Sequence, residues 1–130
     1  MRCQCALLAS LLLSGCGLLS EGGPARYEVS GTVTYQGAPV PYGEIVFEPD
    51  STKGNEGPAA RAVIQNGAYL VDKEKGVVSG PLRVRINGYD GKAPAGGGTM
   101  PHGKSLFAEY IDQVVQPDDV ATHDFTVAKK

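Results

Sequence analysis

The chain has 130 residues, which is the length of a single domain once a short leader is set aside. Lys and Arg number 12 against 14 Asp and Glu, and the net charge of −2 argues against a nucleic-acid-binding protein, which needs a basic surface. The 42% hydrophobic content suffices for a packed core, while 18 Gly and 9 Pro favour a turn-rich all-β chain over a helical bundle.

The start of the chain has the pattern of an export signal. Residues 6–13 form a weakly polar to apolar run after Met1-Arg2, and this run is much shorter than the ~20 residues that span a bilayer. Leu13-Ser14-Gly15-Cys16 follows, and it resembles the lipobox of bacterial lipoproteins. In that motif a leucine and two small residues precede the cysteine that is diacylated before cleavage. We therefore expect residues 1–15 to be a cleaved lipoprotein signal peptide.

The cysteines agree with lipidation at Cys16. Cleavage there discards Cys3 and Cys5, so the mature chain keeps one thiol and forms no internal disulfide. The alternative is an ordinary signal peptide with a stray cysteine. Two or three acyl chains give stable anchoring, so we expect a membrane partner through the N-terminal lipid. By the same resemblance, Gly17 favours the outer membrane in a two-membrane envelope, because an Asp there is the usual inner-membrane retention signal.

The remainder divides into a short tether, residues 16–26 including the lipidated cysteine, and one domain, residues 27–130. Alternation of apolar and polar residues predicts strands in this domain, and Asn66-Gly67 is a strong hairpin signal. Residues 107–115 are ambiguous between short strands and an irregular edge. We expect about seven short strands in a β-sandwich. The clearest of them are residues 27–35, 44–48, 60–65, 68–71, 82–86 and 123–127.

Three segments carry a family resemblance. Residues 30–47 (SGTVTYQGAPVPYGEIVF) resemble the opening of carboxypeptidase regulatory-like domains, whose pattern is G-x-V-x-x-x-G-x-P-V-x-x-A-x-V-x-F. Residues 66–69 resemble the D-G-x-Y turn of that family. Residues 79–86 resemble its P-G-x-Y-x-V-x-V strand, with Pro and Gly transposed and Leu82 in the aromatic slot. The resemblance implies a prealbumin-like (transthyretin-like) or Ig-like Greek-key sandwich, and it specifies no activity.

Few residues suggest chemistry. His123 and Asp124 are neighbours on a predicted strand and so point to opposite faces, which disfavours a catalytic pair. His102 is expected to be solvated in a loop. Two histidines far apart make a poor zinc set, and calcium ligation by Asp118-Asp119 with Asp112 or Asp124 is conceivable but less favoured than a solvated acidic surface. We expect no catalytic residues, no metal and no cofactor, and thus no enzyme.

Two further features have structural and functional interpretations. Arg83 and Arg85 on one strand are expected to pair with Glu44 and Glu48 on another if the strands are neighbours; an anionic-ligand patch is the less favoured alternative. Residues 90–105 form a long glycine-rich loop, and long loops are often functional. The residues that would make this loop a possible interaction site are Tyr89, Met100, His102 and Phe107.

The sequence therefore predicts an envelope lipoprotein with a non-catalytic β-sandwich for protein interaction or structural assembly, whose partner is an envelope protein. The alternative is a carbohydrate or small-ligand binding module at the cell surface. The absence of Trp and the 7% aromatic content favour the first interpretation, because a carbohydrate module needs an aromatic platform.

Overall fold

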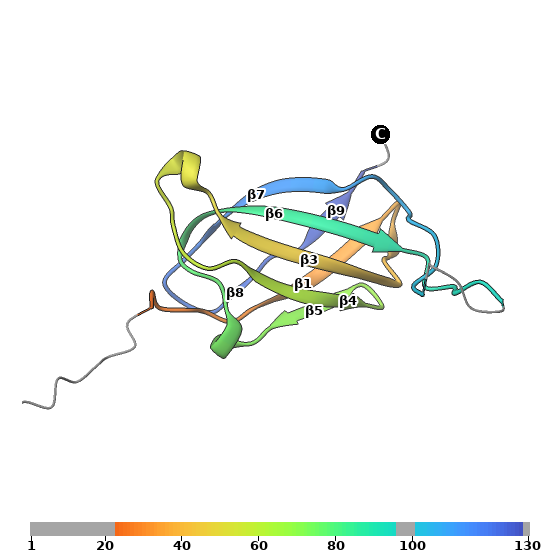
Figure 1. The fold of residues 1–130 in the computed structure, drawn as a ribbon, viewed down its shortest axis with the longest axis horizontal. Coiled ribbons are helices and arrows are strands. Elements are labelled where there is room, and N and C mark those ends of the chain that lie inside the picture. Colours follow the sequence, from red (N-terminus) through yellow and green to blue (C-terminus); the bar gives the residue numbers. More distant parts are fainter. Residues whose placement is uncertain (1–22, 96–100, 129–130) are drawn as a thin grey trace, which may run out of the picture.

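The computed structural model describes residues 23–95 and 101–128. These residues form one curled and mainly antiparallel β-sheet with almost no helix (Figure 1), so the all-β expectation is confirmed. The strands in chain order are β1 (Val29–Tyr35), β2 (Ala38–Pro39), β3 (Tyr42–Pro49), β4 (Ala60–Gln65), β5 (Ala68–Val71), β6 (Gly80–Tyr89), β7 (Tyr110–Gln116), β8 (Ala121–Thr122) and β9 (Phe125–Val127). The two short 3₁₀ helices are η1 (Ser51–Lys53) and η2 (Lys73–Lys75).

The sheet runs in the order β2-β1-β5-β4-β3-β6-β7. Its longest ladder joins β3 to β6 over eight residue pairs, from Tyr42↔Tyr89 to Pro49↔Leu82. The last two strands, β8 and β9, return to β1 and pair with it in parallel. The first and the last strands of the described domain therefore lie side by side, and the sheet is curled (Figure 1).

The core lies on the inner face of this curled sheet. Cross-strand pairs such as Ile45↔Ile86 and Phe47↔Val84 are almost fully buried. An aromatic cluster joins distant strands, with ring centroids 5.9 Å apart for Phe47–Tyr69 and 6.4 Å apart for Phe47–Phe125. Tyr69 is thus a packing residue, as its position after the hairpin turn predicts.

Local signals in the sequence placed most strands correctly. The hairpin between β4 and β5 turns at Asn66 and Gly67, whose φ values of 51° and 76° suit the favoured two-residue turn. Among the described residues, seven strands have three or more residues, which is the expected number. The two-residue strands β2 and β8 come in addition to these seven. The first strand begins at Val29 and not at residue 27, since Tyr27 forms only an isolated bridge with Val77.

Two segments differ from the sequence-based expectation. The segment that was ambiguous, residues 107–115, contains most of a regular strand, β7. This strand begins three residues later than the segment, at Tyr110, and ends at Gln116. The long loop at residues 90–105 has an ordered base, because Asp90 N–H donates to the carbonyl of Lys104 (3.0 Å) and Gly91 N–H donates to that of His102 (2.9 Å). A hairpin-like continuation of β6 therefore carries this loop.

Gly31 marks the closest backbone approach at the junction of β1 with the C-terminal strands. A Cβ atom at this position would collide with the backbone carbonyl of His123 and come within 3.0 Å of the Tyr69 hydroxyl. Neither group is free to move, because Tyr69 donates a hydrogen bond to that same carbonyl at 2.5 Å. The fold therefore requires glycine here.

We expect Gly31→Ala to lower the free energy of unfolding by roughly 3 kcal/mol, because it overpacks a backbone–backbone contact. Urea unfolding measures this change. Gly23→Ala is the matched control, since no atom lies within 4 Å of the added methyl group. Equal unfolding midpoints for the two variants would show that β1 and the C-terminal strands do not meet in this way.

Candidate functional site

The strand β7 forms an edge of the sheet. It pairs with β6 from Gly80↔Gln116 to Ile86↔Tyr110, and within the described part of the chain no strand pairs with its other side. Two apolar side chains on its outer face are exposed, Ile111 at 48% and Val115 at 70%. An edge strand with apolar exposed side chains is a template for pairing with another chain.

A cavity of about 260 Å³ lies at the start of β7, where this strand approaches the ends of β1 and β9. Three aromatic rings line it, and the rings of Tyr35 and Phe107 pack at 5.0 Å with a 45° tilt. Glu109 is the one charged residue of the lining, and its carboxylate is directed to Arg85 and Asn87. The lining residues are Tyr35, Phe107, Ala108, Glu109, Tyr110, Val127 and Ala128.

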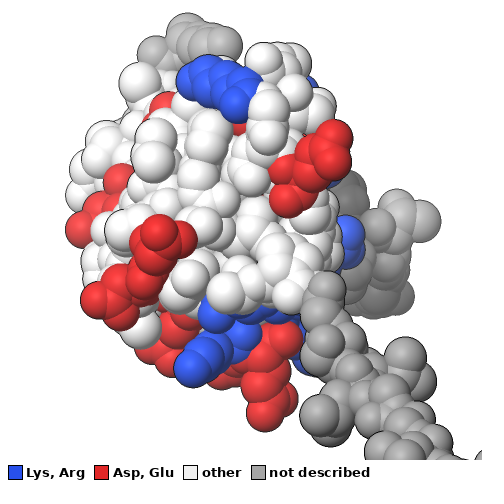
Figure 2. All heavy atoms as spheres, turned by 90° about the vertical axis from the view of Figure 1, so that its left-hand side faces the viewer, with Lys and Arg blue, Asp and Glu red and all other residues white. Residues whose placement is uncertain are grey.

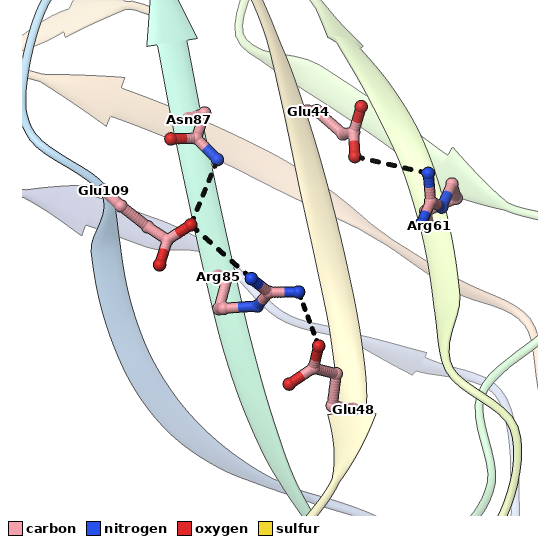
Figure 3. Close-up of polar contacts among 6 residues, drawn as sticks. All are labelled: Glu44, Glu48, Arg61, Arg85, Asn87 and Glu109. Atoms are coloured by element: carbon pink, nitrogen blue, oxygen red, sulfur yellow. Dashed lines mark hydrogen bonds and ion pairs between the residues drawn. The ribbon is translucent and has the colours of Figure 1, made fainter.

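Glu109 also belongs to a polar network on the outer face of the sheet, drawn in Figure 3 together with the separate pair of Glu44 and Arg61. The guanidinium of Arg85 lies between two carboxylates, with Nη2 2.5 Å from Glu48 Oε1 and Nη1 3.7 Å from Glu109 Oε2. The Nδ2 of Asn87 donates weakly to Glu109 Oε2 at 3.5 Å. The Nε of Arg85 is buried and has no acceptor among the described residues. Arg85 is thus held mainly by Glu48.

The expected charge pairing between the two strands is only half correct. Arg85 does pair with Glu48 across β6 and β3, as a diagonal pair, but Glu44 pairs with Arg61 of β4 at 3.7 Å (Figure 3). Arg83 forms no ion pair within the described residues. Register explains Glu44, which lies opposite Asn87 on β6 and so has no arginine of that strand as its direct neighbour. It does not explain Arg83, which lies directly opposite Glu48 although that carboxylate pairs with Arg85. The exposed pair of Glu44 and Arg61 stabilises the fold by ~0.2–1 kcal/mol.

The residues of the predicted interaction loop divide into two groups. His102 is exposed in the loop, as expected, and its ring also stacks on Tyr42 with centroids 3.8 Å apart and lies 6.3 Å from the ring of Tyr89. Phe107 instead packs on Tyr35 in the cavity. Met100 lies outside the described residues. Sequence reasoning placed Phe107 in the loop, whereas the structure places it in the cavity wall.

His123 and Asp124 contact different partners. The Nε2 atom of His123 lies 2.9 Å from Gln116 Oε1, whereas the Asp124 carboxylate accepts hydrogen bonds from the N–H and hydroxyl of Thr32 at 2.9 and 3.1 Å. Burial lowers the pKa of His123, and the nearby charge of Asp124 opposes this shift only in part. The two side chains thus fasten the C-terminal segment to β7 and β1.

The acidic residues considered as calcium ligands lie apart. Asp112 accepts a hydrogen bond from the Tyr110 hydroxyl at 3.3 Å, Asp119 accepts one from the backbone N–H of Val120, and Asp124 accepts one from the backbone N–H of Thr32. Across residues 23–95 and 101–128, no three His, Cys, Asp or Glu side chains gather closely enough to hold a metal ion.

The lipidation residue Cys16 and its signal peptide lie outside the described residues, and the structure begins in the tether at Gly23. None of the helices in the described ranges is long and apolar enough to cross a membrane. No family model matches the chain, and no curated protein matches it. The two family resemblances noted in the sequence therefore stay predictions.

The contact of His123 with Gln116 predicts a pH dependence of stability. The unfolded chain protonates this histidine near its ordinary pKa of 6.5, whereas the folded chain protonates it only at lower pH. The unfolded state therefore binds more protons as the pH falls below about 6.5, and the stability that is present above this pH is progressively lost. We expect His123→Gln to reduce the difference in unfolding free energy between pH 7.5 and pH 5.5, measured by urea titration.

The matched control is His102→Gln, which removes a histidine but leaves His123 in place. It should keep the wild-type pH dependence. An unchanged pH dependence in His123→Gln would show that this imidazole is not buried against Gln116.

Proposed function

We propose that the protein is a lipid-anchored interaction protein of the bacterial cell envelope, and that its non-catalytic β-domain binds a partner by strand addition at β7. The observation that carries this proposal is the open edge of β7. On its outer face this edge presents three uncharged side chains, Ile111, Gln113 and Val115, and the charge nearest to them is the Lys53 ammonium, which donates to Gln113 Oε1 at 2.7 Å. Edge strands that avoid association usually carry charged residues, Pro or bulges.

Strand addition suits this surface for two reasons. The backbone N–H and C=O groups on the open side of β7 offer a ladder of hydrogen bonds to an extended segment. The apolar side chains of Ile111 and Val115 then give cross-strand contacts on the outer face. The partner that fits is an envelope protein with an extended, partly apolar segment.

The lipid anchor rests on the lipobox resemblance at residues 13–16 and on the arrangement of the domain. Six residues lie between Cys16 and Gly23, and the seven Cα–Cα steps span at most roughly 25 Å. The described chain enters at one end of the domain, and the C-terminal end, where Ala128 lines the cavity, lies at the other (Figure 1). A lipid at Cys16 would therefore hold the cavity end of the domain away from the membrane. In a two-membrane envelope, we propose that this membrane is the outer membrane.

The end at which the chain enters supports attachment by lipid more than attachment by charge. Figure 2 looks onto this end and shows acidic and basic side chains interspersed around an uncharged centre. Binding of anionic head groups needs a cluster of basic side chains. Two or three acyl chains would hold the protein without such a cluster.

For the fold, we propose the finer assignment to a carboxypeptidase regulatory-like, prealbumin-like Greek-key sandwich. The return of β8 and β9 to the side of β1 supports it, because this arrangement places a core between β1 with its neighbours and the β3–β6–β7 side of the sheet. The required glycine at Gly31 also agrees with the first glycine of the family pattern.

A small-ligand module is the second candidate function, and the aromatic cavity favours it. Three partly buried rings that pack against the edge of the main core, Tyr35, Phe107 and Tyr110, line it. This candidate predicts binding of a small molecule in the absence of any protein partner, whereas strand addition requires an extended polypeptide.

We expect the mature protein to begin at Cys16 and to carry two or three acyl chains. Intact-mass spectrometry of the protein extracted in detergent measures this modification. Cys16→Ser should give an unmodified protein that leaves the membrane fraction. A soluble, unacylated wild-type protein would overturn the lipid anchor and leave the edge proposal to be tested alone.

The edge proposal predicts that Ile111→Lys combined with Val115→Lys abolishes a specific partner cross-link in intact cells, because charged side chains block strand pairing. The matched control is Val63→Lys with Leu70→Lys. These residues are similarly exposed, at 48% and 56%, but lie on β4 and β5, which are paired on both sides.

The supporting result is a partner that cross-links to the wild type and the control and is lost from the edge variant. A partner retained by both variants would contradict binding at β7. A protein without any partner would favour the small-ligand module instead.

A further inference from the structure

The cavity at the start of β7 lies in a seam of the curled sheet. One wall is the end of the β1–β9 ladder, where Tyr35 is the direct partner of Val127. The other wall is formed by residues 107–110, which lead into β7 and include its first residue. Within the described ranges β9 pairs with β1 and not with β7, and no residue of β6 lines the cavity. The open edge of β7 therefore borders this seam.

The aromatic wall of the cavity is held in place by its own chain. The Phe107 ring covers the backbone of Gly88, where a Cβ atom would lie 2.7 Å from two ring carbons. Leu106 N–H donates to the Gly88 carbonyl at 2.9 Å, and the Ser105 hydroxyl donates to the Phe107 carbonyl at 2.8 Å. The ring of Tyr35 packs on that of Phe107. Walls that are preorganised in this way lower the entropy cost of binding.

The polar side-chain groups of the lining already have partners. The Tyr35 hydroxyl accepts a hydrogen bond from Gln36 Nε2 at 3.1 Å, and the Tyr110 hydroxyl donates to Asp112 Oδ2 at 3.3 Å. The Glu109 carboxylate is directed to the network on the outer face of the sheet and not toward the rings (Figure 3). Burial of a charged group in the cavity would therefore cost free energy that burial of an apolar group does not.

The size of the cavity suits a single side chain. Its volume is about 260 Å³, below the roughly 300–1,000 Å³ of pockets that bind drug-sized ligands. A dry apolar cavity of roughly 150 Å³ is enough to hold a benzene ring. The space at the start of β7 is thus large enough for the side chain of a leucine, methionine or phenylalanine and too small for an oligosaccharide.

We propose that the extended segment that pairs with β7 inserts one large apolar side chain, that of a leucine, methionine or phenylalanine, into this cavity. This inference rests on the proposed strand addition and states which side chain the partner carries. Side chains of an added strand alternate between the two faces of the sheet. Those on the outer face meet Ile111 and Val115, and those on the inner face lie in line with Tyr110, which lines the cavity. The partner then fills the seam between β7 and β9.

The preference of the cavity for an apolar group is testable without the partner. The probes are toluene and benzylammonium, which share a ring and differ in charge, titrated into the mature chain with isotope-labelled Tyr and Phe for NMR. The chain carries Cys16→Ser so that no detergent is needed, because toluene would dissolve in detergent micelles. We expect toluene to shift the resonances of Tyr35, Phe107 and Tyr110 and to bind roughly ten-fold more tightly than benzylammonium. Equal affinity for the two probes, or no shift of the three rings, would overturn the proposal.

A ring added to the lining should fill the cavity from within. Ala128→Phe and Ala108→Phe do so from opposite walls, and each should abolish toluene binding and the partner cross-link in intact cells. Two variants guard against the loss of folding in one of them, which an unfolding curve detects. Ala68→Phe is the matched control, because Ala68 is also an exposed alanine but lies on β5, outside the lining. It should keep both properties.

The edge variant with Ile111→Lys and Val115→Lys separates this inference from the proposed function. Both positions lie outside the lining, so this variant should lose the partner cross-link and keep toluene binding. A partner that survives Ala128→Phe and is lost from the edge variant would leave strand addition standing and refute the inserted side chain. A partner that is lost with Ala128→Phe and retained by the edge variant would refute strand addition at β7.

Discussion

The pairing of β1 on both of its sides determines the rest of the architecture. On one side β1 pairs with β5 and then with β2; on the other it pairs with β8 and β9. This second ladder brings the C-terminal segment back across the domain, with His123 N–H bonded to Ser30 and Asp124 bonded to Thr32. Because β8 and β9 pair with β1, β7 has only β6 as a described neighbour. The open edge of β7 and the cavity beside it therefore result from the pairing of β8 and β9 with β1 and not with β7.

The candidate site combines elements with different stabilities. The walls of the cavity derive from the sheet itself, through the close contact of Phe107 with Gly88, whereas its rim depends on exposed ion pairs that stabilise weakly.

Much of the fold was predictable because it follows from local patterns. The alternation of Leu82, Val84 and Ile86 places the inner face of β6, and Asn66-Gly67 sets the β4–β5 hairpin. β7 was ambiguous for a physical reason: apolar and polar residues occur on both of its faces, with Ile111 and Val115 on the outer face and Asp112 and Gln116 on the inner one, so the alternation is weak. The cavity could not be predicted, because long-range pairing alone brings its parts together from three distant stretches of sequence. The stacking of His102 likewise depends on the β3–β6 register that places Tyr42 beside Tyr89.

The hydrogen bond between Thr32 and Asp124 joins residues 92 positions apart, across nearly the whole domain. β1 is therefore synthesised before the other described strands, but its second side is covered only when β8 and β9 pair with it. During synthesis this side of β1 stays open, and the domain reaches its native pairing only once β8 and β9 have emerged. A product that lacks β8 and β9 has an uncovered side on β1 as well as the open edge of β7, and two such edges allow molecules to join into chains. The two C-terminal strands therefore guard against edge-to-edge association as well as completing the fold.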